Sequence, residues 1–260
     1  MHTPLCHHAS GEPTEYAAQA LKIGLTEIGM SDHGPMIRDD FDDWHMRQED
    51  LDLYVEKVRK AQTDHPSLSI KLGLEMDYLP GHEDWIRDVA GRHAWDYFIG
   101  SVHYVSDTWA MDNPHRKEEW QNHDVDEIWL TYCERLTLAA ESGLFEIIGH
   151  ADLCKKFGYY PQRDGTAMFA GFLDAAAKSG VAIELNTGGL RRGPSEIYPS
   201  RSILAEAQRR RIPITFGSDA HAPDQVGADF SKATALAQDA GYRHCLQFTG
   251  RQKEEIRIAT

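Results

Sequence analysis

The sequence predicts an α/β fold built around a parallel sheet whose strands are separated by helices. Short apolar runs alternate with longer amphipathic stretches along the chain, which is typical of βαβ units. Several of the short runs are continuously apolar, as strands covered on both faces tend to be. No Pro/Ser-rich linker interrupts the pattern, and 260 residues is an ordinary length for an α/β barrel. We therefore expect a single domain over residues 1–260.

Apolar runs and amphipathic stretches place the individual elements. The predicted strands cover 27–30, 70–76, 97–102, 145–149, 181–186 and 212–217, and one further strand, mostly absent, is expected before them. The predicted helices cover 13–24, 51–63, 126–142, 167–179, 200–210 and 229–240. Gly24, Gly143 and Gly180 stand where helices should end, as C-cap glycines do.

Composition argues against several classes of function. The formal net charge is −14, whereas a broad nucleic-acid interface would need a basic face. No apolar run approaches the roughly 18 residues of a membrane span, and the chain does not open with a signal peptide. The four cysteines are far apart, so we expect free thiols and a cytoplasmic location. Neither G-x-G-x-x-G nor G-x-S-x-G occurs, so neither a dinucleotide cofactor nor a serine nucleophile is indicated.

Metal-ligating residue types recur directly after the predicted strands. They are His2, His7 and His8 near the start, then Asp32, His33, Glu75, His103, His150, Asp152, Asp219 and His221. The carboxyl ends of parallel barrel strands converge on one face, so these side chains should meet. The other seven histidines lie in predicted helices or loops and are interpreted as surface or core residues: His45, His65, His82, His93, His115, His123 and His244.

The residue types suit divalent metal chemistry. Imidazole nitrogens and carboxylate oxygens bind zinc, manganese or iron, and paired ions can clamp a phosphoryl group during ester hydrolysis. Taken singly, each residue has a simpler explanation: Asp32 and Asp219 could be helix caps, and Glu75 could be a buried ion-pair partner. Cys6 is interpreted as a small buried apolar residue.

Seven segments in series resemble the PHP (polymerase and histidinol phosphatase) family, and in particular its monofunctional histidinol-phosphate phosphatase branch. They are HTPLCHHA at 2–9, SDHGP at 31–35, GLEMDY at 73–78, GSVHY at 100–104, GHADL at 149–153, LNTGGLR at 185–191 and GSDAH at 217–221. The resemblance implies a distorted (β/α)7 TIM-like barrel with two to three divalent ions (Zn, Mn or Fe) at the carboxyl-terminal mouth.

The resemblance also implies three groups of ligands. His2, Glu75 and Asp219 would hold one ion; Glu75, His103 and His150 would hold a second; His8, His33 and His221 would hold a third. His7 is then a spacer, and Asp32 would orient an imidazole.

The implied reaction is metal-assisted hydrolysis of a small phosphomonoester, L-histidinol phosphate, in histidine biosynthesis. Phosphate-binding cations are expected at Arg191, then Lys155, with Arg192 a neighbour; Ser101 and Ser218 would donate hydrogen bonds. For Lys155 and Lys156 a solvated charge pair is an equal alternative. Asp152 could be the general acid, or it could orient His150; His221 or Asp219 could deliver the proton instead.

Alternative functions are a PHP phosphoesterase acting on another phosphate ester or nucleotide, and a catalytically impaired metal-binding domain. The acidic segment 39–43 could lie near a substrate ammonium, although a solvated loop is the simpler interpretation. The sequence does not specify the oligomeric state.

One departure from the family pattern falls at the first residue. The family opens with H-x-H, and only the second histidine, His2, is present, because the first would lie immediately before Met1. We expect that the start codon has been assigned too far downstream, since a barrel that lacks its first strand would expose unpaired edges. Genuine loss of the ligand, or a histidine left by a purification tag, are the alternatives.

Overall fold

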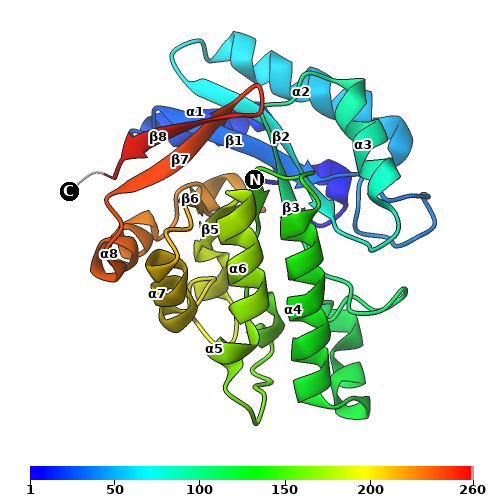
Figure 1. Cartoon of the computed structure of the whole chain (residues 1–260). Coiled ribbons are helices and arrows are strands. Elements are labelled where there is room, and N and C mark those ends of the chain that lie inside the picture. Colours follow the sequence, from blue (N-terminus) through cyan, green and yellow to red (C-terminus); the bar gives the residue numbers. More distant parts are fainter. Residues whose placement is uncertain (259–260) are drawn as a thin grey trace.

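The computed structural model describes residues 1–258 and places six strands in one parallel sheet (Figure 1). The strands pair in chain order: β1 (Glu27–His33), β2 (Ser69–Asp77), β3 (Tyr97–Ser101), β4 (Ile147–Ile148), β5 (Ala182–Asn186) and β6 (Ile214–Gly217). Every neighbouring pair is parallel, so all six carboxyl ends lie at one edge. The six predicted strands are confirmed, the fourth in a shorter form.

Helices cover the outer face of the curved sheet (Figure 1). They are α1 (Pro13–Lys22), α2 (Leu51–Asp64), α3 (Glu83–Arg92), α4 (Val125–Glu141), α5 (Gly165–Met168), α6 (Ala170–Ser179), α7 (Arg201–Arg209) and α8 (Phe230–Ala240). Each of the longer helices buries one apolar stripe, as α4 does with Trp129, Tyr132 and Leu136. Sequence reasoning missed α3, because only Ile86 and Val89 are buried among its charged residues.

A hairpin at the end of the chain was not predicted. It consists of β7 (His244–Thr249) and β8 (Gln252–Arg257), which pair antiparallel. Leu246 and Phe248 of β7 pack in one buried cluster with Tyr97, Ile99, Ile147 and Ala182 of the main sheet. The resemblance implied seven barrel strands; within residues 1–258 six parallel strands form a half-barrel, and the hairpin fills its concave side.

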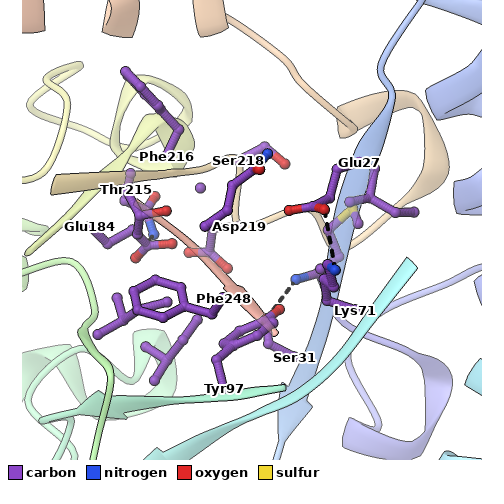
Figure 2. A pocket seen from close by; sticks show the side chains of 18 of the residues that line it. Glu27, Ser31, Lys71, Tyr97, Glu184, Thr215, Phe216, Ser218, Asp219 and Phe248 are labelled. Carbon is purple, nitrogen blue, oxygen red and sulfur yellow. Dashed lines mark hydrogen bonds and ion pairs between the residues drawn. The ribbon is translucent and has the colours of Figure 1, made fainter. Parts of the chain in front are cut away.

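The sheet is open between β1 and β6, and Met1 and His2 connect its two sides. Ser31 N–H donates to Met1 O (3.0 Å), and His2 N–H donates to Ala220 O (2.9 Å). Met1 and His2 also line a cavity of about 250 Å³. Figure 2 shows Glu184 and Thr215 on one side of this cavity and Glu27 and Lys71 on the other. The expected truncated strand and the single domain stay predictions.

None of the described helices is both long enough and apolar enough to cross a membrane.

Candidate active site with clustered metal ligands

Three buried side chains meet at the carboxyl ends of β2, β3 and β4, and we name Glu75, His103 and His150 the inner cluster. Glu75 Oε1 lies 2.9 Å from His150 Nε2 and 3.7 Å from His103 Nε2. The same oxygen accepts a 2.6 Å hydrogen bond from Ser101 Oγ. Gly149 permits this packing, because a Cβ there would lie 2.7 Å from Ser101 Oγ. The strand ends thus bring together the three residues of one implied ligand group.

His2 and Asp219 adjoin the inner cluster through the second oxygen of Glu75. His2 Nε2 lies 3.4 Å from Glu75 Oε2 and 3.1 Å from Asp219 Oδ1. Glu75 therefore presents one oxygen to the inner cluster and the other to His2, as a carboxylate shared by two ions would. Asp32, proposed from the sequence to orient an imidazole, faces His2, with Oδ1 3.4 Å from His2 Nδ1.

The remaining implied ligands form a more accessible group at the mouth, and we name His8, His33 and His221 the rim cluster. The His8 ring centroid lies 5.2 Å from that of His33 and 4.9 Å from that of His221. His8 Nε2 and His221 Nε2 face each other at 3.1 Å. Their Nδ1 atoms lie 2.7 Å from Cys6 O and 3.0 Å from Asp219 O, so each ring is oriented by a carbonyl of its own loop.

These donors fit divalent metal ions. Two imidazole nitrogens at 3.1 Å can share one proton, or they can bind one ion together. Within residues 1–258, the buried atoms His2 Nδ1, His33 Nδ1 and His150 Nδ1 have no hydrogen-bond partner. The ligand atoms of His2, His33 and His221 lie within 4.8 Å of one another, as do those of His2, Glu75 and Asp219. Such buried histidine and carboxylate clusters could hold metal ions of the zinc type.

Two of these residues have a left-handed backbone conformation, which several loop residues outside the site share. His150 and Asp219 follow β4 and β6 and have positive φ angles of 22° and 49°. Side chains larger than glycine rarely adopt such angles, and residues held there cluster at functional sites. The sheet thus holds two of the proposed ligands in a costly backbone conformation at its active edge.

The two clusters differ in protonation. Burial disfavours charge on Glu75 and His150, but their mutual hydrogen bond and attraction dominate. The pKa of Glu75 falls to about 2, and the pKa of His150 rises to about 9. In the rim cluster, burial and the nearby charge of His2 lower the pKa of His221 to about 3 and the pKa of His33 well below its ordinary value. Without metal, the inner cluster is an ion pair, whereas the rim imidazoles are neutral.

Sequence reasoning missed a chain of acidic and histidine side chains behind His103. Asp77 Oδ2 lies 2.9 Å from His103 Nδ1 and 2.9 Å from His45 Nε2, and Asp42 Oδ2 lies 2.7 Å from His45 Nδ1. Asp77 could have been found, because it stands two residues after Glu75 in a strand and so shares its face. His45 had been interpreted as a surface or core residue; it is buried, and no local pattern links it to the site.

A cavity of about 460 Å³ opens over both clusters. Its wall includes two cations, Lys156 and Arg192, and also Asp43 and Trp44. Lys156 Nζ lies 2.7 Å from Asp112 Oδ2. A concave, partly apolar space of this size with a few charged groups is typical of a small-molecule site.

Lys155 and Asp152, both predicted to be catalytic, are not among the residues that line this cavity. They form a buried ion pair, with Lys155 Nζ 2.9 Å from Asp152 Oδ2. Lys155 also pairs with Glu196 (3.0 Å), and Ser200 N–H donates to Asp152 Oδ2 (2.8 Å). Burial raises the pKa of Asp152 despite the neighbouring ammonium. The pair fastens the segment 196–200 to the end of β4.

Three of the predicted substrate-binding residues also lie outside the lining of the larger cavity: Arg191, Ser101 and Ser218. Arg191 Nη2 donates to Ser218 O (2.7 Å) and to Asp219 O (3.0 Å), so it holds the loop after β6. Ser101 is occupied by Glu75, and Ser218 lines the smaller cavity between β1 and β6 (Figure 2). Arg192 alone of the predicted phosphate-binding residues lies in the wall.

Fold and site together define an α/β enzyme of the half-barrel type, with histidine and carboxylate ligands at the carboxyl ends of its strands. The PHP domain profile matches residues 1–188, and a PHP-associated profile matches residues 201–230. The chain belongs to the PHP domain family.

Two relatives and one solved structure extend this result. A Deinococcus radiodurans protein named "Probable histidinol-phosphatase" is 41% identical over 244 residues, which cover 94% of this chain and 93% of that protein. The Bacillus subtilis protein named histidinol-phosphatase is 28% identical, with 87% of this chain and 94% of the relative covered. The fold matches a Lactococcus lactis histidinol phosphate phosphatase, crystallised with zinc, L-histidinol and phosphate, at a TM-score of 0.80 and 21% identity; the match covers 98% of this chain and 97% of that one.

Proposed function

We propose that this protein is a metal-dependent phosphomonoesterase that hydrolyses L-histidinol phosphate to L-histidinol and phosphate. One observation carries the proposal: the eight predicted ligands form one contiguous group at the carboxyl ends of the strands, beside a cavity whose wall includes Lys156 and Arg192. The relative at 41% identity bears a histidinol-phosphatase name and supports this choice of substrate.

We propose that two to three divalent ions (zinc, manganese or iron) are held by His2, Glu75 and Asp219, by the inner cluster, and by the rim cluster. When bound, the ions would act as Lewis acids that lower the pKa of water and neutralise phosphoryl charge. The chain's own contribution is to fix the ligands: Ser101 and His150 hold the first oxygen of Glu75.

The phosphate group is proposed to bind between the metal ligands and the two cations in the cavity wall, Lys156 and Arg192. Lys156 thereby takes the role first expected of Lys155, because Lys156 lines the cavity and Lys155 does not. Arg191 is a positioning residue in this proposal, because its guanidinium holds the carbonyls of Ser218 and Asp219.

Proton delivery to the leaving alkoxide is proposed for Asp219 or His221, which line the cavity, in place of Asp152, which does not. Asp43 also lines the cavity, and we place the substrate's ammonium beside its carboxylate. Trp44 offers an aromatic surface beside it, with its ring centroid 5.0 Å from that of His33.

A phosphate-release assay tests the substrate. Metal-loaded protein is expected to turn over L-histidinol phosphate with a kcat/KM well above that for nucleoside monophosphates or a sugar phosphate. Equal rates on all three would point to a phosphoesterase of other specificity, and no release from any would point to an impaired enzyme. We propose a small phosphorylated molecule as the binding partner.

The four cysteines are free and buried, which agrees with the reducing cytoplasm proposed for this protein.

A further inference from the structure

The loop between β1 and α2 places one buried histidine against the back of the inner cluster. His45 is 5% exposed, and it lies between two carboxylates that come from different parts of the chain. Its Nδ1 is 2.7 Å from Asp42 Oδ2, and its Nε2 is 2.9 Å from Asp77 Oδ2. Since an ionised carboxylate can only accept, both ring nitrogens of His45 act as donors.

Asp77 connects this histidine to a proposed metal ligand. The oxygen that accepts from His45 also accepts from His103 Nδ1 (2.9 Å), and the other oxygen accepts from His103 N–H (3.1 Å). With Nδ1 donating to Asp77, His103 keeps its lone pair on Nε2. That nitrogen faces Glu75 Oε1 at 3.7 Å, which is the side on which an ion of the inner cluster would bind.

Asp42, at the other side of His45, is also connected to the segment that carries His103. Asp42 accepts a 2.6 Å hydrogen bond from the hydroxyl of Tyr104, the residue that follows His103. Asp42 Oδ1 also accepts from the N–H groups of Trp44 and His45, which fixes the turn that carries His45. The contacts form a closed ring through Asp42, His45, Asp77 and the pair 103–104, so a change at His45 is transmitted to His103 from both sides.

We propose that His45 is a positioning residue that acts through Asp77 to hold the His103 imidazole in the orientation and tautomer needed to bind a metal ion with Glu75 and His150. The inference rests on the metal binding of the proposed function but not on the identity of its substrate. Removing His45 would take away one of the two donors to Asp77 Oδ2, so His103 alone would hold this carboxylate, and neither side chain would be fixed from behind.

Two substitutions separate the two hydrogen bonds of His45. In His45→Asn the short amide can replace Nδ1 toward Asp42 but cannot reach Asp77, whereas in His45→Gln the amide can reach the Nε2 position. The readout is stepwise zinc affinity of the metal-stripped protein, measured by competition with a fluorescent chelator. A His150→Gln variant identifies which binding step belongs to the inner cluster.

We expect His45→Asn to weaken the inner-cluster step roughly 10- to 100-fold, the range typical of partners that orient metal ligands. His45→Gln should weaken that step less, and both variants should leave the rim step unchanged. His93→Gln is the matched control: His93 also bonds a carboxylate, Asp52 at 2.8 Å, but outside the site, and no step should change.

Equal weakening of every step by His45→Asn would reveal a merely structural residue and overturn the inference, as would an unchanged inner-cluster step. If His45→Asn does not fold, the comparison of His45→Gln with wild type decides, and equal inner-cluster affinities would again overturn it. Wild-type protein that shows no zinc step sensitive to His150→Gln would instead refute the metal site itself.

Discussion

The inner cluster and the two loop histidines of the rim cluster are held in different ways, whereas His33, the third rim residue, ends β1 and is buried. Glu75, His103 and His150 come from neighbouring strand ends and are about 5% exposed, and the carboxylate of Asp77 orients His103. His8 and His221 come from loops, and only carbonyls two residues away orient them. His221 is 18% exposed at its side chain.

This difference shows what orients a metal ligand before the ion binds. A histidine ligand held by a buried carboxylate needs little reorganisation when an ion binds, because its partner already fixes the ring and its tautomer. A ligand on a loop must be ordered at that moment. We therefore expect the inner cluster to retain metal more tightly than the rim cluster.

Glu75→Gln should have the largest effect, because Glu75 faces both His2 and the inner cluster. We expect a fall in kcat on the order of 10³-fold, comparable to the loss of a major electrostatic group, measured by phosphate release with excess zinc. Glu27→Gln is the control, since Glu27 pairs with Lys71 and contacts no proposed ligand. Activity that survives in Glu75→Gln would remove this site as the catalytic centre.

Lys155→Met and Lys156→Met test two neighbours with different surroundings. Loss of Lys155 leaves Asp152 buried and unpaired, so the free energy of unfolding should drop by about 3–5 kcal/mol, measured by denaturant titration. Lys156→Met should cost less stability, because its partner Asp112 is 14% exposed whereas Asp152 is 1% exposed, and it should raise KM. The reverse pattern would restore Lys155 as the phosphate ligand.

His8→Gln should weaken the rim step roughly 10- to 100-fold in a zinc titration and leave the inner-cluster step in place. His7→Gln is the adjacent control, and its zinc affinities should match wild type, because His7 belongs to neither cluster. A larger effect from His7 than from His8 would mean that the ligand at this position has been misassigned.

The zinc affinities of the two clusters should also depend differently on pH. The pKa of His150 is raised to about 9, so the ring carries a proton at pH 8 that zinc must displace. Inner-cluster affinity should therefore rise with pH up to about 9. The lowered pKa values of His221 and His33 mean that these rings are already neutral, so the rim step should change little above about pH 7. Parallel pH dependence of both steps would contradict this assignment.

Much of this site could be predicted, because strands deliver their carboxyl ends to one edge whatever the loops do. That rule brought Glu75, His103 and His150 together from segments far apart in sequence. It could not predict His45, whose position depends on a loop that Asp42 folds, nor the choice between Lys155 and Lys156.

The same limits apply to the fold. Six parallel strands followed from their apolar runs, but β8 has mostly exposed, charged residues and β7 an irregular pattern, so the hairpin left no clear signal. Ser101 and Arg191 were predicted to bind phosphate, and only three-dimensional packing shows that they bond to Glu75 and to the loop after β6.

Stepwise removal of zinc from the loaded protein tests the central claim most directly. Chelators of increasing strength are added, bound zinc is measured after each, and His8→Gln and His150→Gln identify which ion leaves. Because the inner cluster is buried and Asp77 orients His103, we expect the rim ion to leave first and the inner ion last. Loss of the inner ion before the rim ion, or of these two ions together, would contradict the account.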